Sequence, residues 1–119
     1  MTTILVVEDE RAIADLLSII LADEGYRVVV ARNGREGLAR VVEGWPDVIL
    51  SDIMMPVLNG LLMCRSLQDD LAYRTIPLVF MSAAPLPPMA RECHYAAFLA
   101  KPFSLAAVLD TIARVLPPA

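Results

Sequence analysis

Five short apolar runs, separated by segments of helical periodicity, constrain the fold of this chain more than any other feature. The runs are expected to be strands and cover residues 4–7, 26–31, 47–51, 76–81 and 97–100. Short apolar runs are typical of parallel strands that are buried on both faces of a sheet. In a chain of 119 residues, which suits one domain, strands that alternate with helices form a parallel, doubly wound sheet with helices on both faces. The sequence therefore predicts an α/β fold.

The segments between the runs repeat their apolar residues at helical spacing. They are expected to form helices over 10–22, 35–42, 60–69 and 105–115. Ser104 is a suitable N-cap for the last of these helices. Between the fourth and fifth runs, Pro85, Pro87 and Pro88 prevent a continuous helix. We therefore expect only a short or irregular fourth helix, over residues 89–94.

The composition indicates one domain outside the membrane. Hydrophobic residues make up 57% of the chain, yet no apolar run approaches the roughly 20 residues of a membrane span. The net charge of −4 argues against direct binding to nucleic acid. We expect one cytoplasmic domain over residues 1–119, in which 116–119 are either a free tail or the start of a linker. Cys64 and Cys93 lack metal-ligand spacing, and both are expected to be reduced and partly buried.

Chemically reactive side chains follow four of the expected strands. They are Glu8, Asp9 and Glu10 after the first strand, Asp52 after the third, Ser82 after the fourth and Lys101 after the fifth. In open α/β sheets, ligands bind outside the carboxyl ends of the strands. If the first and third strands are neighbours, three carboxylates meet there and repel one another unless a positive charge intervenes. Mg²⁺, which binds one or two carboxylates and keeps several waters, is the usual solution.

Such a site suits phosphoryl transfer. A carboxylate attacks the phosphorus, Mg²⁺ and Lys101 neutralise the phosphoryl oxygens, and Ser82 donates a hydrogen bond. Each residue alone has an ordinary explanation, and we expect Glu10 to be a helix-start charge favoured by the helix dipole. The joint placement of Asp9, Asp52, Ser82 and Lys101 at one sheet edge favours a functional site.

Over essentially its full length, the chain resembles the receiver domains of two-component response regulators, including the chemotaxis regulators. The resemblance rests on the segments ILVVEDE (4–10), PDVILSD (46–52), Met55-Pro56, Asn59-Gly60, Ser82-Ala83 and FLAKPF (98–103). It implies the flavodoxin-like strand order 2-1-3-4-5 and a signalling domain that catalyses only its own phosphorylation and dephosphorylation. It also implies a sensor histidine kinase or phosphotransfer protein as donor, and a downstream effector domain or protein that receives the signal.

The resemblance assigns a role to each residue of the expected site. Asp52 is the acceptor of the phosphoryl group. Mg²⁺ is expected to be bound by Asp9 directly and by Glu8 through water. Asp52 and the backbone carbonyl of Met54 complete the expected protein ligands.

The same resemblance assigns the switch. Ser82 moves to the phosphoryl group, Phe98 turns inward with it, Lys101 binds the phosphoryl oxygens, and the Lys101–Pro102 peptide bond is expected to be cis. The chain departs from the family between Ser82 and Lys101, where it is shorter than usual and where prolines at 85–88 replace the start of the fourth helix. The usual dimer face of the family is therefore in question, and the oligomeric state stays open.

Two other functions compete with a receiver domain. An Mg²⁺-dependent phosphatase of the aspartyl-phosphate type needs a second acid near the nucleophile, but Met54 stands two residues past Asp52. A flavodoxin-like FMN-binding protein needs a phosphate-cradling loop after the first strand, where Glu8, Asp9 and Glu10 would repel the phosphate. The phosphorylation switch is favoured, and the phosphatase is the alternative.

Overall fold

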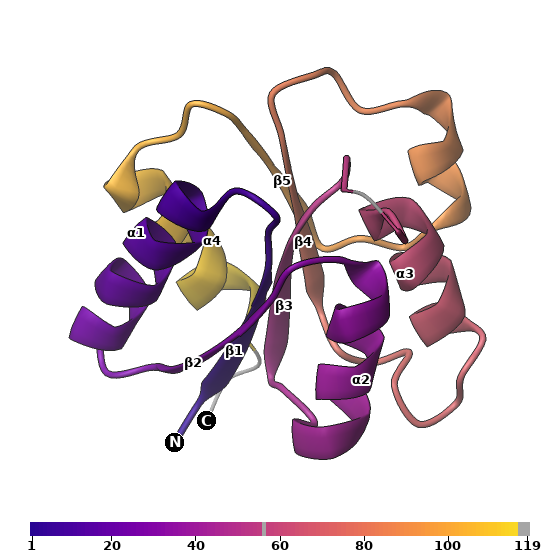
Figure 1. Cartoon of the computed structure of the whole chain (residues 1–119), viewed down its shortest axis with the longest axis horizontal. Helices are drawn as coiled ribbons and strands as arrows, with labels where there is room; N and C mark the ends of the chain where they lie inside the picture. The colour runs from indigo at the N-terminus through magenta and orange to yellow at the C-terminus, as the bar shows by residue number, and fades with distance from the viewer. Residues whose placement is uncertain (56, 117–119) are drawn as a thin grey trace.

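The five expected strands form one parallel sheet in the computed structural model, which describes residues 1–55 and 57–116. The strands are β1 (Thr3–Val7), β2 (Arg27–Ala31), β3 (Val48–Asp52), β4 (Leu78–Ser82) and β5 (Ala97–Ala100), in the order β2-β1-β3-β4-β5 (Figure 1). This order confirms the predicted fold. Pro56 of the family motif and residues 117–119 of the expected tail or linker lie outside the described residues.

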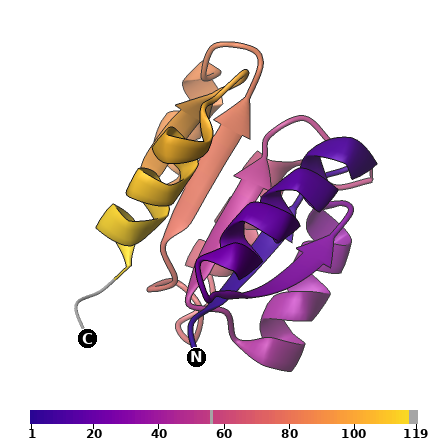
Figure 2. The same ribbon diagram turned by 90° about the vertical axis from the view of Figure 1, so that its left-hand side faces the viewer.

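Helices cover both faces of the sheet. α1 (Arg11–Asp23) and α4 (Leu105–Val115) lie on one face, which is turned toward the viewer in Figure 2, and α2 (Gly34–Gly44) and α3 (Gly60–Gln68) lie on the other. Within β1, Ile4 belongs to the core under α1 and α4, whereas Leu5 belongs to the core under α2 and α3. Since successive side chains point to opposite faces, both positions must be apolar, and this produces the continuous runs of the sequence.

Element boundaries differ from the prediction by one or two residues. The third strand is expected to begin at Asp47 and begins at Val48; Asp47 is bonded to Thr3 both through its N–H and through its carboxylate, which accepts a hydrogen bond of 2.8 Å from the Thr3 N–H. The last helix begins as expected, since the Ser104 side chain accepts from the Ala107 N–H. Such side-chain contacts, rather than hydrophobic periodicity, fix where the elements begin.

The fourth helix is reduced to one short turn, as the prolines predict. This turn, η1 (Pro88–Glu92), is a 3₁₀ helix that begins at a proline and buries Ala90. It lies against α3 on the right of Figure 1. The last helix of the fold, which follows β5, is therefore α4.

The expectation of two reduced cysteines was wrong for this structure. Cys64 in α3 and Cys93 after η1 form a disulfide, with their Cα atoms 6.2 Å apart and both side chains buried. The physical reason is that α3 and η1 pack over the same face of the sheet and bring two residues that are distant in sequence within disulfide range. Burial of both residues was expected correctly.

Candidate functional site

The candidate site lies at the carboxyl edge of β1 and β3. These strands are neighbours, and Val7 pairs with Ser51 in their register. Glu8 and Asp52 follow Val7 and Ser51 directly, so they leave the sheet side by side. Main-chain pairing holds Glu8 in place on its other flank, where its N–H donates a 2.9 Å hydrogen bond to the Ala31 carbonyl of β2.

Three carboxylates meet at this edge. Glu8, Asp9 and Asp52 each offer an oxygen, and the three oxygens lie within 4.8 Å of one another. Glu8 is 1% exposed and Asp52 6% exposed, whereas Asp9 is open to solvent. Glu10 is not part of this cluster; it stands at the N-cap position of α1, consistent with a helix-start residue.

Lys101 supplies the positive charge between the two buried acids. Its Nζ donates to Glu8 Oε1 at 2.7 Å and to Asp52 Oδ2 at 2.9 Å. The backbone of Lys101 is fixed by a 2.8 Å hydrogen bond from its N–H to the Ser82 carbonyl, and the Lys101–Pro102 peptide bond is cis, as expected. Burial lowers the pKa of Lys101, but the hydrogen bonds and charges of the two acids outweigh burial and raise it, which keeps the ammonium charged.

Glu8 is the acid of the cluster whose negative charge is disfavoured by its surroundings. Burial, and then hydrogen bonding to Asp52, raise the pKa of Glu8 to about 8, although Lys101 acts in the opposite direction. The second oxygen, Oε2, is buried and has no hydrogen-bond partner among the described residues. Buried carboxylate oxygens normally have a hydrogen-bond partner. Because the described residues supply none, this oxygen is available to a ligand from outside the protein chain.

The oxygen-only donor set fits a hard divalent cation. Such ions prefer carboxylates, carbonyls and waters, and Mg²⁺ commonly takes one or two carboxylates and completes its shell with water. Glu8 and Asp52 offer buried oxygens, while the exposed Asp9 leaves one side open for water. The residues present therefore fit Mg²⁺.

The loop after β3 presses closely against the site. The Met54 N–H lies 3.3 Å from Asp52 Oδ1, and the Met54 side chain is exposed. Gly60, the first residue of α3, packs so tightly that an added Cβ would come within 2.3 Å of the Asp52 carbonyl oxygen. Only glycine allows this approach, because the neighbouring atoms are backbone and cannot move aside easily. The sequence places Gly60 at the start of a helix, but its contact with the acid-bearing strand emerges only from the structure.

Ser82 touches the cluster only through its backbone carbonyl, which accepts from the Lys101 N–H, and among the described residues neither the Ser82 nor the Phe98 side chain bonds to the acids. Ser82 ends β4, is buried, and accepts a 3.1 Å hydrogen bond on its hydroxyl from the Ala84 N–H; among the described residues it makes no hydrogen bond to Asp52. Phe98 is partly buried, is paired with Phe80 in the β4–β5 register, and packs against the core under α2 and α3. The structure thus brings the side chains of Glu8, Asp9, Asp52 and Lys101 together, without the side chains of Ser82 and Phe98.

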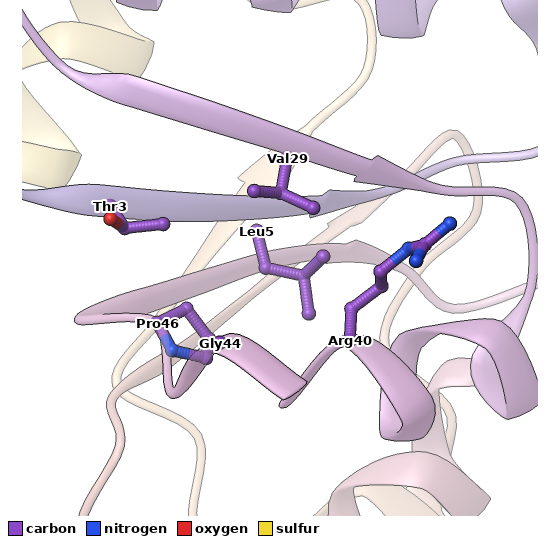
Figure 3. Close-up of a pocket in the computed structure, with 6 residues that line it drawn as sticks. All are labelled: Thr3, Leu5, Val29, Arg40, Gly44 and Pro46. Atoms are coloured by element: carbon purple, nitrogen blue, oxygen red, sulfur yellow. The ribbon is translucent and has the colours of Figure 1, made fainter. Parts of the chain in front are cut away.

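Two hollows differ in their relation to the site. An open, mainly apolar hollow of about 360 Å³ borders Lys101 and is lined by Ile13, Leu16, Ala83, Lys101, Pro102 and Phe103. A second hollow, of about 20 Å³, lies between β1 and the end of α2 (Figure 3). It is lined by residues such as Thr3 and Pro46, at the amino ends of the strands, and has room for little more than one water. Of these two hollows the first adjoins the reactive groups, as does a further hollow of about 80 Å³ that Glu8 and Asp9 line.

No helix in the described ranges 1–55 and 57–116 is long and apolar enough to cross a membrane.

Comparison with known proteins gives a consistent answer along the whole chain. The family described as the response regulator receiver domain matches residues 4–113. The response regulator PleD of Caulobacter vibrioides is 44% identical over 80 residues, and the DNA-binding response regulator MtrA of Mycobacterium tuberculosis is 39% identical over 80 residues. These alignments cover 67% of this chain but only 18% and 34% of the two proteins. The chain therefore spans a minor part of the curated relatives it matches.

Solved structures extend the likeness to nearly every described element. The chemotaxis response regulator CheY4 of Vibrio cholerae superposes with a TM-score of 0.91 at 32% identity, covering 98% of this chain and 99% of that chain. The receiver domain of a sensor histidine kinase from Pseudomonas aeruginosa, solved with a magnesium ion in its active-site cleft, has a TM-score of 0.86 at 28% identity and covers 95% of both chains.

Proposed function

This chain belongs to the response regulator receiver domain family, and on that premise we propose that it is a phosphorylation-dependent switch whose phosphoryl acceptor is Asp52. The observation that carries the proposal is that Lys101 Nζ contacts both Glu8 and Asp52. Beside it lies the buried Oε2 of Glu8, which has no hydrogen-bond partner among the described residues. This arrangement supports the proposal, because the carboxylate of Asp52, the ammonium of Lys101 and Glu8 Oε2 lie in one cluster.

Asp52 is the proposed nucleophile because of its position and its partners. It ends a buried strand, it is 6% exposed, and Lys101 holds its Oδ2. Among the described residues, the other oxygen, Oδ1, has only the long contact from the Met54 N–H and is the freer of the two. An Asp52 oxygen attacks the phosphorus of a phosphohistidine, the phosphorus–nitrogen bond breaks, and an aspartyl phosphate results.

Mg²⁺ is the proposed cofactor. Glu8, Asp9 and Asp52 would hold it, with the backbone carbonyl of Met54 as a further ligand proposed from the family resemblance. When bound, the ion neutralises phosphoryl oxygens and the charge of the acids. Support comes from the unpaired Oε2 of Glu8 and from the magnesium ion in the related receiver domain from Pseudomonas aeruginosa.

The conformational response is proposed to run through Ser82, Phe98 and Lys101. The Ser82 hydroxyl would exchange its hydrogen bond with Ala84 for one to the phosphoryl group, and Phe98 would follow by repacking. Because the Lys101 N–H is bonded to the Ser82 carbonyl, a shift at either residue reaches the other through the main chain. The segment between β4 and β5 is then the element whose position carries the signal.

The partners follow from the same proposal. The donor is a sensor histidine kinase or a phosphotransfer protein, and the apolar hollow beside Lys101 offers it a surface next to the acceptor. The recipient is an effector domain or protein. We propose a cytoplasmic domain over residues 1–119 that acts on itself rather than on an outside substrate. The aspartyl-phosphate phosphatase alternative is less favoured, because the exposed Met54 beside Asp52 cannot serve as a general acid.

Incubation with a small acyl-phosphate donor tests the proposal. Intact-mass measurement should show the gain of a single phosphoryl group in the presence of Mg²⁺ and little gain when the ion is chelated. Asp9→Asn should slow the gain strongly, while the matched variant Glu10→Gln, one residue further and outside the acid cluster, should behave like the parent. Phosphoryl uptake that is indifferent to Mg²⁺ would remove the basis for the metal site.

A further inference from the structure

The segment η1 is attached to α3 by three contacts that lie together. Cys93 is joined to Cys64 by the disulfide. A side-chain carboxylate oxygen of Glu92 lies 3.3 Å from a guanidinium nitrogen of Arg65. The His94 carbonyl accepts a 2.9 Å hydrogen bond from the Gln68 side chain. The three partners on α3, Cys64, Arg65 and Gln68, lie between its middle and its C-terminal end. Figure 1 shows the resulting proximity of this turn to α3.

Of these contacts, only the disulfide is strong. The Arg65 and Glu92 side chains are 53% and 58% exposed, and ion pairs of this kind contribute little to stability. The hydrogen bond to His94 is also exposed. A five-residue 3₁₀ turn has little stability of its own, and it buries only Ala90. Ala90 and Cys93 also pack on the core under α2 and α3, but the disulfide is the strongest link to α3, so the oxidation state of the two sulfurs strongly affects how firmly η1 is held.

The sulfurs are shielded while η1 is in place. Cys64 is 2% exposed and Cys93 is 3% exposed. The hollow that reaches Cys64, between α3 and His94, measures about 10 Å³, too small for an attacking thiol. Exchange at this bond requires η1 to leave α3. In a cytoplasmic protein, which is the location we propose, disulfides are generally transient and redox-sensing rather than permanent.

We propose that Cys64 and Cys93 are a redox modification site, closed and opened by thiol–disulfide exchange with a small disulfide of the glutathione type. In closing, the thiolate of one cysteine attacks a sulfur of the oxidised co-reactant, forms a mixed disulfide and expels one co-reactant thiolate. The second cysteine then attacks the mixed disulfide, forms the Cys64–Cys93 bond and expels the other. The two protons of the protein thiols pass to the two released thiolates, so the protein is oxidised and the co-reactant is reduced.

The consequence for signalling rests on the proposed function. The β4–β5 segment lies between Ser82, the last residue of β4, and Ala97, the first residue of β5, and the Cys64–Cys93 bond joins its second half to α3. In the oxidised form, the disulfide holds this segment on α3, so movement of Ser82 does not displace it. In the reduced form the same movement displaces η1. Since such coupling is reciprocal, phosphorylation should make the disulfide easier to reduce.

The test uses the wild-type protein equilibrated in reduced and oxidised glutathione. Alkylation followed by intact mass should show that both thiols disappear together as a pair, without a stable glutathione adduct. Amide hydrogen exchange at residues 89–94 should then be slower in the oxidised form by at least about tenfold, within a ceiling of about four hundredfold that loop-closure entropy sets for a sequence separation of 29. Amides of β2, at the far edge of the sheet, should change much less.

Two outcomes would overturn the proposal: thiols that stay free in oxidised glutathione while the protein is folded, or equal exchange at residues 89–94 in both forms. The double variant Cys64→Ala, Cys93→Ala should match the reduced protein under both conditions. If this variant does not fold, the wild-type comparison decides alone. Asp52→Asn should retain the redox response, so a failure of the phosphorylation proposal is distinguished from a failure of this one.

Discussion

Replacing Glu8 by glutamine should make the metal-free protein more stable, although it removes a residue of the proposed site. The wild-type fold holds this buried acid with a pKa of about 8, against 4.5 when it is free in water. At pH 7 the folded state therefore keeps a proton that the unfolded state releases. While the folded state stays protonated, each pH unit above the unfolded-state pKa lowers the free energy of unfolding by about 1.4 kcal/mol. Between pH 4.5 and pH 7 the loss is therefore about 3 kcal/mol.

Glutamine keeps the size of the side chain and does not titrate. Its carbonyl oxygen can still accept from Lys101 Nζ in place of Glu8 Oε1. Because the variant has no proton to keep at this position, its free energy of unfolding at pH 7 should exceed that of the parent by up to about 3 kcal/mol. This corresponds to roughly 10 °C in the melting temperature. Because the folded-state pKa is raised, the gain is absent below about pH 4.5, grows through neutral pH and levels off above about pH 8.

Thermal and urea unfolding, followed by circular dichroism in a chelating buffer at several pH values, measures the effect. Glu10→Gln is the matched control, because Glu10 lies outside the acid cluster, and we expect it to change stability by no more than about 0.5 kcal/mol. Added Mg²⁺ should reverse the order, stabilising the parent more than Glu8→Gln. A Glu8→Gln variant that is less stable than the parent at pH 7, or a difference that does not vary with pH, would refute the reasoning.

The other predictions concern the geometry, the metal and the switch. Gly60→Ala should lower stability by about 1–3 kcal/mol and slow phosphoryl uptake, because its Cβ would meet the Asp52 carbonyl oxygen. The control Gly44→Ala, where a Cβ meets nothing within 4 Å, should be neutral or stabilising. Equal effects of the two variants in chemical unfolding would contradict this. Asp9→Ala should weaken Mg²⁺ binding by calorimetry far more than Glu10→Ala, and equal losses would show that the metal site is misassigned. Ser82→Ala should still accept a phosphoryl group but lose the phosphorylation-induced change in hydrogen exchange between β4 and β5; an unchanged response would exclude Ser82 from the switch.

The sheet and the composition of the site could be predicted because both depend on repeated, local patterns. Apolar runs such as 4–7 must be continuous when both faces of a strand are covered, and the acids that follow them must then gather at one edge. The reduced fourth helix followed from proline chemistry at 85–88 for the same reason. In each case the physical cause acts within a few residues of the pattern that reveals it.

What the sequence did not reveal depends on contacts between distant segments. The Cys64–Cys93 pair is separated by 29 residues and meets only because α3 and η1 pack on the same face. The unpaired oxygen of Glu8 depends on burial by the surrounding loops rather than on its neighbours in the chain. The bond of the Asp47 carboxylate to the Thr3 N–H likewise joins segments that are distant in the sequence.

The central claim is that Asp52 receives the phosphoryl group, and locating that group on the chain tests it most directly. The protein is phosphorylated with a small donor and Mg²⁺, treated with borohydride, which reduces an aspartyl phosphate to homoserine, and sequenced by tandem mass spectrometry. We predict homoserine at position 52 alone, and none in a sample treated identically without the donor. Homoserine at position 9, or a phosphoryl group that survives borohydride on another residue type, would contradict the account.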